Sequence, residues 1–211
     1  MSTVSTIQQA PRHPPLHPIN TIDRIIQNHP LTAALRENPL LTESRPHLDA
    51  PDVLRGESLL AGTLAGHQKI SVPPFIFKDK QNKRCVMIMH LGGNVCSHPG
   101  IVHGGLLATL LDESFAWCCT HPFATRVGVT ARLSVNYRNP TYANSYIALT
   151  SEVVKFEGRK AWLEGRIETL EVDGLPSTLL VEGHALFIEP RESAVSLAPR
   201  LDSHEWKYHE T

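Results

Sequence analysis

The chain has 211 residues, a length that suits one domain or one domain with an extension. Apolar residues make up 41% of the sequence, enough for a sizeable core, and the formal net charge is −1. A net charge this close to zero excludes a strong electrostatic attraction to nucleic acid or to an anionic membrane. It is compatible with a local basic patch for a phosphorylated ligand. No segment has the roughly 20 consecutive apolar residues of a membrane span.

The cysteines indicate a reducing compartment. The chain has four, Cys85, Cys96, Cys118 and Cys119, and none forms a C-x-x-C pair. Neighbouring cysteines such as the last two cannot easily bond to each other without strain, and the N-terminus has no secretory signal. We therefore expect free thiols and an intracellular location, cytoplasmic or, as the alternative, mitochondrial.

Residues 1–20 are rich in proline, serine, threonine and histidine and have few large apolar side chains. Such a composition predicts a disordered leader, because too little apolar surface is available to offset the entropy of ordering. A mitochondrial presequence is the alternative. The absence of acidic residues before Asp23 fits it, whereas the single basic residue, Arg12, fits it poorly.

Residues 21–68 are predicted to form a helical and irregular extension that wraps over the main domain. Thr21 can cap a short helix over residues 21–29. Pro30 and Pro39 limit helix length, and residues 44–51 are predicted to be a loop. The helix would present three isoleucines on one face: Ile22, Ile25 and Ile26.

Residues 69–190 are predicted to form one domain that contains both strands and a helix. Residues 191–211 are predicted to be a polar tail. Residues 70–79 and 83–92 predict a strand hairpin, and the loop of residues 92–105 is punctuated by glycine and proline. Residues 106–119 have apolar residues at helical spacing and predict a buried helix of about four turns. Four strand-like segments separated by turn signals come next: 127–140, 145–158, 159–174 and 177–190.

Two strands, one apolar helix and four antiparallel strands predict an α+β protein. A single helix this apolar needs a sheet around it on several sides, and a highly curved antiparallel sheet provides one. The predicted fold class is therefore the hotdog fold, with the N-terminal extension added to it.

The segment HPGIVHGG, which leads into this helix, carries the first functional signal. The first N–H groups of a helix have no intrahelical partner, so Gly104 or Gly105 can present an N–H, backed by the helix dipole, to a carbonyl oxygen. Such an arrangement is an oxyanion hole. The second signal is Asp112, a carboxylate within a run of leucines, on a stripe of otherwise small residues: Gly105, Ala108, Thr109 and Ala116. This stripe would let a ligand or a second subunit approach closely, whereas Glu113 lies about 100° away around the helix and is expected to be structural.

The segment HPGIVHGGLLATLLDE resembles the signature of the PaaI-like hotdog thioesterases, the phenylacetate-pathway type, and most of all the branch with the human thioesterase superfamily members and their fungal relatives. In that family and in this chain, His-Gly-Gly is followed by six residues and then Asp. The resemblance extends from about Ile70 to Ile188. It implies that Asp112 is the catalytic carboxylate, as nucleophile or as base on water. Gly104 would polarise the thioester carbonyl, His103 would orient the carbonyl or the loop, and Thr130 would help to hold the attacking water.

The resemblance also implies an acyl-CoA or related thioester substrate, no cofactor and no metal, and a site completed across a homodimer or tetramer. Some relatives have an asparagine six residues before the histidine, where this chain has Ser97, with Asn94 further back. Arg159 and Lys160 are implied as contacts for the CoA phosphates, with Lys155 beside the same turn and Arg138 after the preceding strand.

Other functions remain open. A hotdog dehydratase or hydratase could use His98 and Asp112, and a non-catalytic acyl-CoA-binding protein could keep the fold. A metal site built on His90, His98 and His103 lacks ligand spacing and a thiol pair. A nucleophile at Cys118 or Cys119 is disfavoured because thiols on a buried helix usually serve packing.

Overall fold

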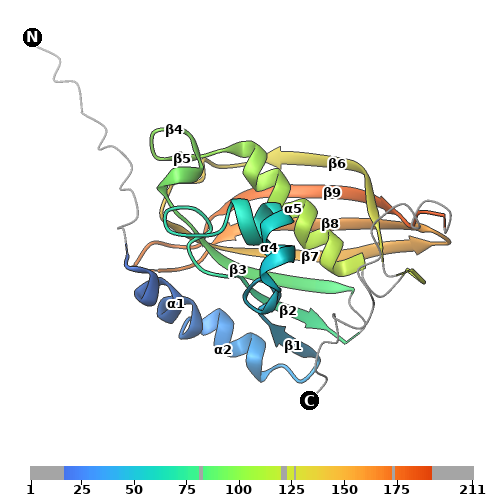
Figure 1. Ribbon diagram of the computed structural model, residues 1–211, viewed down its shortest axis with the longest axis horizontal. Coiled ribbons are helices and arrows are strands. Elements are labelled where there is room, and N and C mark those ends of the chain that lie inside the picture. The colour runs from blue at the N-terminus through green and yellow to red at the C-terminus, as the bar shows by residue number, and fades with distance from the viewer. Residues whose placement is uncertain (1–16, 81–82, 120–122, 126, 173, 192–211) are drawn as a thin grey trace, which may run out of the picture.

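The computed structural model describes residues 17–80, 83–119, 123–125, 127–172 and 174–191. Within them, a seven-stranded sheet with the order β1-β2-β3-β7-β8-β9-β6 lies against one long helix, α5 (Figure 1). Every pair of neighbouring strands in this sheet is antiparallel. The molecule is therefore an α+β hotdog protein with additional N-terminal helices, and the predicted fold class is confirmed.

The helices are α1 (Ile19–Gln27), α2 (Pro30–Glu37), α3 (Pro46–Asp49), α4 (Asp52–Glu57), a π-helix (Leu59–Thr63), a 3-10 helix (Gly93–Val95) and α5 (Gly104–Cys119). The strands are β1 (Leu41–Ser44), β2 (Phe75–Asp79), β3 (Arg84–Leu91), β4 (Cys96–His98), β5 (Ile101–Val102), β6 (Val129–Tyr137), β7 (Ser145–Glu157), β8 (Lys160–Thr169) and β9 (Leu179–Ile188). None of the described helices is long and apolar enough to cross a membrane.

The N-terminal extension differs from the prediction in three places. Helix α1 begins at Ile19, where the carbonyl of Pro18 accepts hydrogen bonds from the first turn, so Thr21 lies inside the helix and does not cap it. The predicted loop 44–51 contains α3, because Pro46 at the first helical position has a backbone preset for a helix. Residues 41–44 form strand β1 by pairing with β2. Residues 1–16 of the predicted leader and residues 192–211 of the predicted tail lie outside the described residues.

Strand β3 shows why the sheet is buried on both faces. Its side chains alternate, with Cys85, Met87 and Met89 in the core under α5 and Val86 and Ile88 in a second core under α1. Such alternation follows from the two-residue period of a strand. The extension therefore packs α1 on the sheet face opposite α5.

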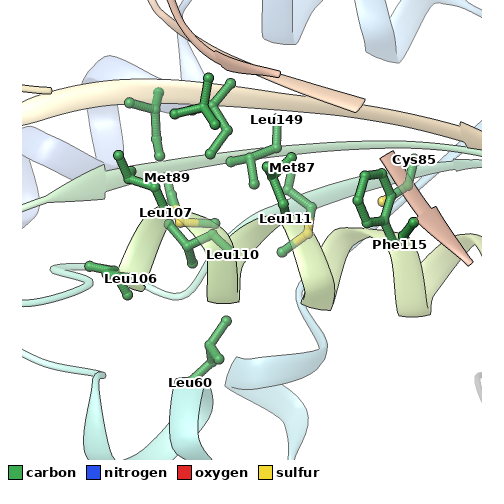
Figure 2. Packing of buried hydrophobic residues seen from close by; sticks show 14 of the residues in the cluster. Leu60, Cys85, Met87, Met89, Leu106, Leu107, Leu110, Leu111, Phe115 and Leu149 are labelled. Atoms are coloured by element: carbon green, nitrogen blue, oxygen red, sulfur yellow. The ribbon is translucent and has the colours of Figure 1, made fainter. Parts of the chain in front are cut away.

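Helix α5 lies unusually close to the sheet at two glycines. A Cβ atom on Gly165 would come within 2.7 Å of the Phe115 ring, and one on Gly183 within 2.8 Å of Leu111. The leucines of α5 are buried between the sheet and the extension, and Figure 2 shows Leu60 facing the helix from the side opposite the sheet. Burial of each such side chain stabilises the fold by roughly 1.5–3 kcal/mol relative to exposure.

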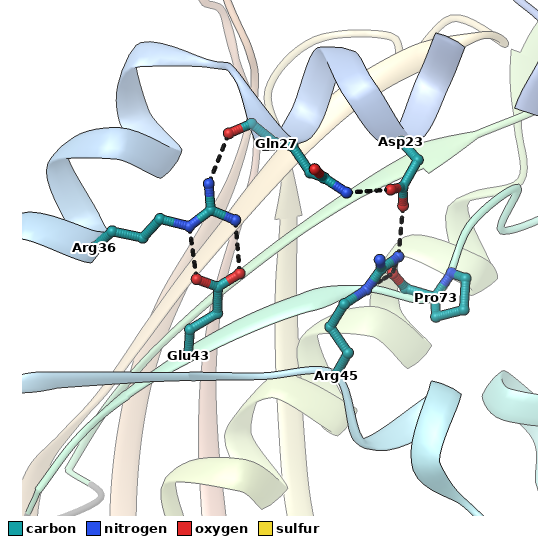
Figure 3. Close-up of polar contacts among 6 residues, drawn as sticks. All are labelled: Asp23, Gln27, Arg36, Glu43, Arg45 and Pro73. Carbon is teal, nitrogen blue, oxygen red and sulfur yellow. Dashed lines mark hydrogen bonds and ion pairs between the residues drawn. The ribbon is translucent and has the colours of Figure 1, made fainter. Parts of the chain in front are cut away.

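Polar clamps fix the extension to the sheet (Figure 3). Arg45 Nη2 donates to Asp23 Oδ1 and to the Pro73 carbonyl, both at 2.7 Å, and its guanidinium lies 4.0 Å from the centre of the Phe75 ring. Arg36 also forms a two-pronged ion pair with Glu43 of β1. Because Asp23 is in α1 and Pro73 precedes β2, the Arg45 clamp ties the helix to the sheet.

Candidate active site

Asp112 lies on the partly exposed face of α5, and its neighbour Leu111 is fully buried. The Thr130 hydroxyl, at the beginning of β6, donates to Asp112 Oδ1 at 2.7 Å. A hydrogen bond to an ionised acceptor is stronger than one between neutral groups, and this one fixes the orientation of the carboxylate. Glu113 instead accepts from the Trp117 indole at 3.2 Å and lies 3.7 Å from His47, as a structural residue would.

The beginning of α5 distinguishes the two glycines. The Gly105 N–H donates to His103 Nδ1 at 2.8 Å, so this N–H is already used as a helix cap. The Gly104 N–H has no acceptor among the residues that the structure describes. Of the two donors predicted from the sequence, only Gly104 therefore offers a free N–H. With Nδ1 as acceptor, the neutral ring of His103 carries its proton on Nε2 and can donate from there.

Tyr137 contacts the candidate site, which the sequence did not reveal. Its hydroxyl donates to the Gly104 carbonyl at 2.8 Å, and its ring lies 3.3 Å from where a Cβ of Gly104 would be. Thr130 and Tyr137 are seven residues apart, so a regular strand would point them to opposite faces. The register of β6 shifts between Thr130 and Arg132, and this bulge brings both side chains to the face of α5.

Gly104 and Asp112 do not meet within one chain. Asp112 follows Gly104 by eight positions of the helix, which corresponds to about 12 Å along the axis. A thioester carbonyl needs its oxyanion donor and its attacking group within roughly 3 Å of it. One chain therefore carries two separate candidate half-sites, one at Gly104 and one at Asp112 and Thr130.

The loop before α5 holds the other predicted polar residues. His103 N–H donates to the Val95 carbonyl at 2.9 Å, which places the 3-10 turn with Asn94 beside His103. Ser97 lies on β4 in a short hairpin with β5, and its hydroxyl is 3.2 Å from His98 Nδ1. Both Asn94 and Ser97 are exposed, as contacts for a ligand would have to be.

The predicted basic residues do not form one cluster. Lys160 pairs with Ile188 of β9, which pairs with Val129 of β6, so Lys160 lies two strands, about 10 Å, from the beginning of β6. Arg138 follows the other end of β6, where it forms an ion pair with Glu182 at 2.6 Å. The structure thus brings Lys160 toward the Asp112 half-site and separates Arg138 from it.

Two of the remaining cations on the β7–β8 hairpin have partners of their own. Arg159 Nη1 donates to the Glu189 carbonyl at 3.1 Å, and Lys155 pairs with Glu157 at 2.8 Å. The backbone contact holds Arg159 to the end of β9, whereas Lys155 pairs with a similarly exposed neighbour on the same strand.

The alternative cysteine nucleophiles and His90 lie in buried surroundings. Burial raises the pKa of the Cys119 thiol to about 12, and the pKa of Cys118 is also raised, above all by its hydrogen bond with Cys85, so neither is a ready nucleophile. His90 is buried against Ser71, and burial lowers its pKa to about 4. The described residues contain no group of three side chains that could hold a metal ion.

The chain is similar in sequence to several known proteins. A family model described as thioesterase superfamily matches residues 99–173. The UPF0644 protein PB2B4.06 of Schizosaccharomyces pombe is 33% identical over 171 residues, which cover 81% of this chain and 65% of that one. An uncharacterized protein of the same yeast is 32% identical over 60% of this chain and 72% of its own. Acyl-coenzyme A thioesterase THEM4 of Mus musculus is 32% identical over 54% of this chain and 46% of its own.

One matching solved structure is the PaaI protein of Escherichia coli, 16% identical, with a TM-score of 0.45 over 51% of this chain and 76% of that one. The chain spans about two thirds or less of most of the curated relatives that it matches, and one of them, from Candida albicans, is named as mitochondrial. Fold, motif and relatives agree, and the chain belongs to the thioesterase superfamily.

Proposed function

We propose that this protein is an acyl-CoA thioesterase that hydrolyses an acyl-CoA, or a related acyl thioester, to a free acid and a thiol. The observation that carries the proposal is the carboxylate of Asp112, held by Thr130 on the open face of an apolar helix. Thioester hydrolysis needs a polarised carbonyl and a carboxylate beside it, and it needs no metal or cofactor.

The proposed reaction uses both half-sites. The Gly104 N–H donates to the thioester carbonyl oxygen, and His103 orients the carbonyl through its Nε2–H. Asp112 takes a proton from water, the water oxygen bonds to the carbonyl carbon, the C–S bond breaks, and the proton passes to the leaving thiolate. Direct attack is the second route: the Asp112 carboxylate bonds to the carbonyl carbon, the C–S bond breaks, the thiolate leaves, and water then hydrolyses the mixed anhydride. In a single turnover in ¹⁸O-water, label in Asp112 identifies this route with water attacking the Asp112 carbonyl, whereas trapping the anhydride with hydroxylamine detects it whichever carbonyl water attacks.

We propose that two copies of the chain complete each site, with Gly104 of one protomer facing Asp112 of the other. The distance of about 12 Å between these residues along α5 supports this arrangement. The small residues Ala108, Thr109 and Ala116 on the same helix face are partly exposed, which would allow a second subunit to approach. A homodimer is the smallest assembly that meets this need, and a tetramer of two such dimers would meet it as well.

Subunit complementation tests the shared site. Chains with Asp112→Asn are mixed and refolded with chains with Gly104→Pro, each inactive alone. A shared site predicts recovered hydrolysis, because half of the sites in a mixed dimer combine two intact half-sites. Activity that stays absent in proven mixed dimers would show that each site lies within one chain.

A thiol-release assay tests the activity. The purified chain is incubated with a panel of acyl-CoAs of different chain length and aryl-CoAs, together with a thiol reagent. Release of thiol supports a thioesterase, whereas hydration of an enoyl-CoA without thiol release identifies a hydratase, and tight binding without turnover identifies a binding protein. The same assay after extensive dialysis against EDTA should give unchanged rates, since no metal is proposed.

We propose a mitochondrial location in place of a cytoplasmic one. The name of the Candida albicans relative, which is 30% identical over 142 residues, supports it. Fractionation of cells that express the chain with a C-terminal tag tests this location, and a tag found only in the cytosolic fraction would contradict it.

A further inference from the structure

A groove of about 300 Å³ lies away from Asp112, at the end of the sheet where β7 begins and β8 ends. Twelve of the described residues line it, and none of them is charged. Its polar side chains are largely used within the protein: Asn139 donates to the Leu179 carbonyl, and Ser145 donates to the Tyr142 carbonyl, both at 2.7 Å. What the groove offers to a ligand is therefore mainly apolar and tyrosine surface.

The N-terminal part of the chain reaches the rim of this groove at His17. The His17 ring lies 2.7 Å through Nδ1 from the hydroxyl of Tyr146, which lines the groove, and the two ring centres are 5.9 Å apart. The residues that precede His17 in the sequence are PRHPPL, three prolines and a leucine among six residues. A proline-rich segment, with Arg12 and His13 as its polar residues, is thus covalently joined to the edge of an uncharged groove.

We propose that the groove binds this chain's own residues 11–16. Proline-rich segments lose little conformational entropy on binding and dock on aromatic-lined grooves, which Tyr142 and Tyr146 provide here. The contact at His17 makes the effective concentration of the segment high, because binding is intramolecular. The groove carries no cation that would favour a phosphate. Prolines and Leu16 of the segment suit its apolar surface, and the long side chain of Arg12 can keep its charge in water.

The groove also touches the loop that leads to the candidate active site. Tyr142 pairs with Ile101, and the Thr141 carbonyl accepts the Val102 N–H at 2.9 Å. The Ala143 N–H donates to the Gly100 carbonyl at 2.9 Å. One wall of the groove therefore supports residues 100–102, directly before His103. Binding of residues 11–16 would steady this wall, a consequence separate from the chemistry at Asp112.

Photo-cross-linking in the full chain tests the proposal without reference to catalysis. The groove carries Leu175→p-benzoylphenylalanine, at a lining position that is 37% exposed. Its matched control is Val154→p-benzoylphenylalanine, on β7 outside the groove and 49% exposed. Equal amounts of isotopically heavy and light chains are mixed, so that cross-links within a chain are distinguished from those between chains.

The proposal expects the Leu175 probe to cross-link to residues 11–16 of its own chain, and the Val154 probe not to. A charged side chain is costly in an apolar groove, so Leu16→Asp should lower the yield by roughly five-fold or more. Three outcomes would overturn the proposal: no cross-link to residues 11–16, cross-links only between heavy and light chains, or a yield that Leu16→Asp leaves unchanged.

Discussion

The hydroxyl of Thr130 donates to Asp112 Oδ1 at 2.7 Å and so joins the edge strand β6 to helix α5 across 18 residues of sequence. The bond occupies one carboxylate oxygen, so that in the proposed reaction Oδ2 takes the proton of the attacking water. It also explains why a carboxylate can lie in a run of leucines, since its charge has a fixed donor and a partly open face.

Thr130→Val removes this donor with little change in shape. A hydrogen bond to a charged group contributes roughly 1.5–3 kcal/mol, so we expect kcat for acyl-CoA hydrolysis to fall about 10-fold or more. Thr130→Ser keeps the hydroxyl and should restore most of the rate, and Ser134→Ala on the same strand is the control. Equal activity of the valine and serine variants in steady-state assays would show that the hydroxyl has no role.

Gly104→Pro and Gly104→Ala test the oxyanion donor as a pair. Proline suits the first position of a helix but lacks an N–H, whereas alanine keeps the N–H, and both add a Cβ near the Tyr137 ring. Loss of one oxyanion donor typically costs roughly 10²–10³-fold in kcat, so the proline variant should be far slower than the alanine variant. Similar kcat values for the two would remove the Gly104 N–H from the mechanism.

His103 has two roles that substitution can separate. Its Nδ1 caps α5 at Gly105, and its Nε2–H is available to a substrate. His103→Asn can still cap a helix but lacks the Nε2 donor, whereas His103→Ala loses both, so only the alanine variant should lose about 1 kcal/mol of unfolding free energy. Denaturant titrations and kcat are measured on both. An asparagine variant with wild-type kcat would leave His103 a cap only.

Lys160 is expected to bind the nucleotide end of CoA. Lys160 pairs with Ile188 of β9, which in turn pairs with Val129, the residue before Thr130. Arg159 on the same hairpin instead donates to the Glu189 carbonyl. Lys160→Ala should raise KM while kcat stays within a few-fold, because a contact made equally in ground and transition states changes only binding. The effect should shrink at high salt and with a pantetheine thioester. Lys155→Ala, at a lysine paired with Glu157, is the control.

The Arg159→Ala,Lys160→Ala double variant should raise KM further if both residues contact the phosphates. A large fall in kcat with unchanged KM would instead place these residues near the reacting carbonyl.

The central helix and six of the strands could be predicted because their apolar residues recur at the helix or strand period. Strand β1 could not, since its four residues LTES show no alternation of apolar side chains and pair with β2 only through tertiary structure. The prediction that Thr21 caps the first helix was wrong. Several residues in this segment could begin a helix, and in the structure Pro18 is the residue before its first turn.

The spacing from His103 to Asp112 predicts candidate site residues, but it does not determine their geometry. That Gly105 is capped by the His103 ring depends on a side-chain rotamer. That Tyr137 joins Thr130 on one face depends on a bulge in β6, which no local residue pattern signals. The position of Lys160 depends on β9 lying between β8 and β6, a sheet order that strand patterns do not determine.

The rate of acyl-CoA hydrolysis by Asp112→Asn, compared with Glu113→Gln one residue further on, tests the central role of Asp112 most directly. The first change removes the proposed base and keeps its shape, and the second alters a carboxylate that contacts Trp117 and His47. We expect Asp112→Asn to retain its circular dichroism spectrum and oligomeric state while it loses roughly 10²–10⁴-fold in kcat. Glu113→Gln should stay within a few-fold of wild type. Hydrolysis by Asp112→Asn at a near wild-type rate would contradict the account.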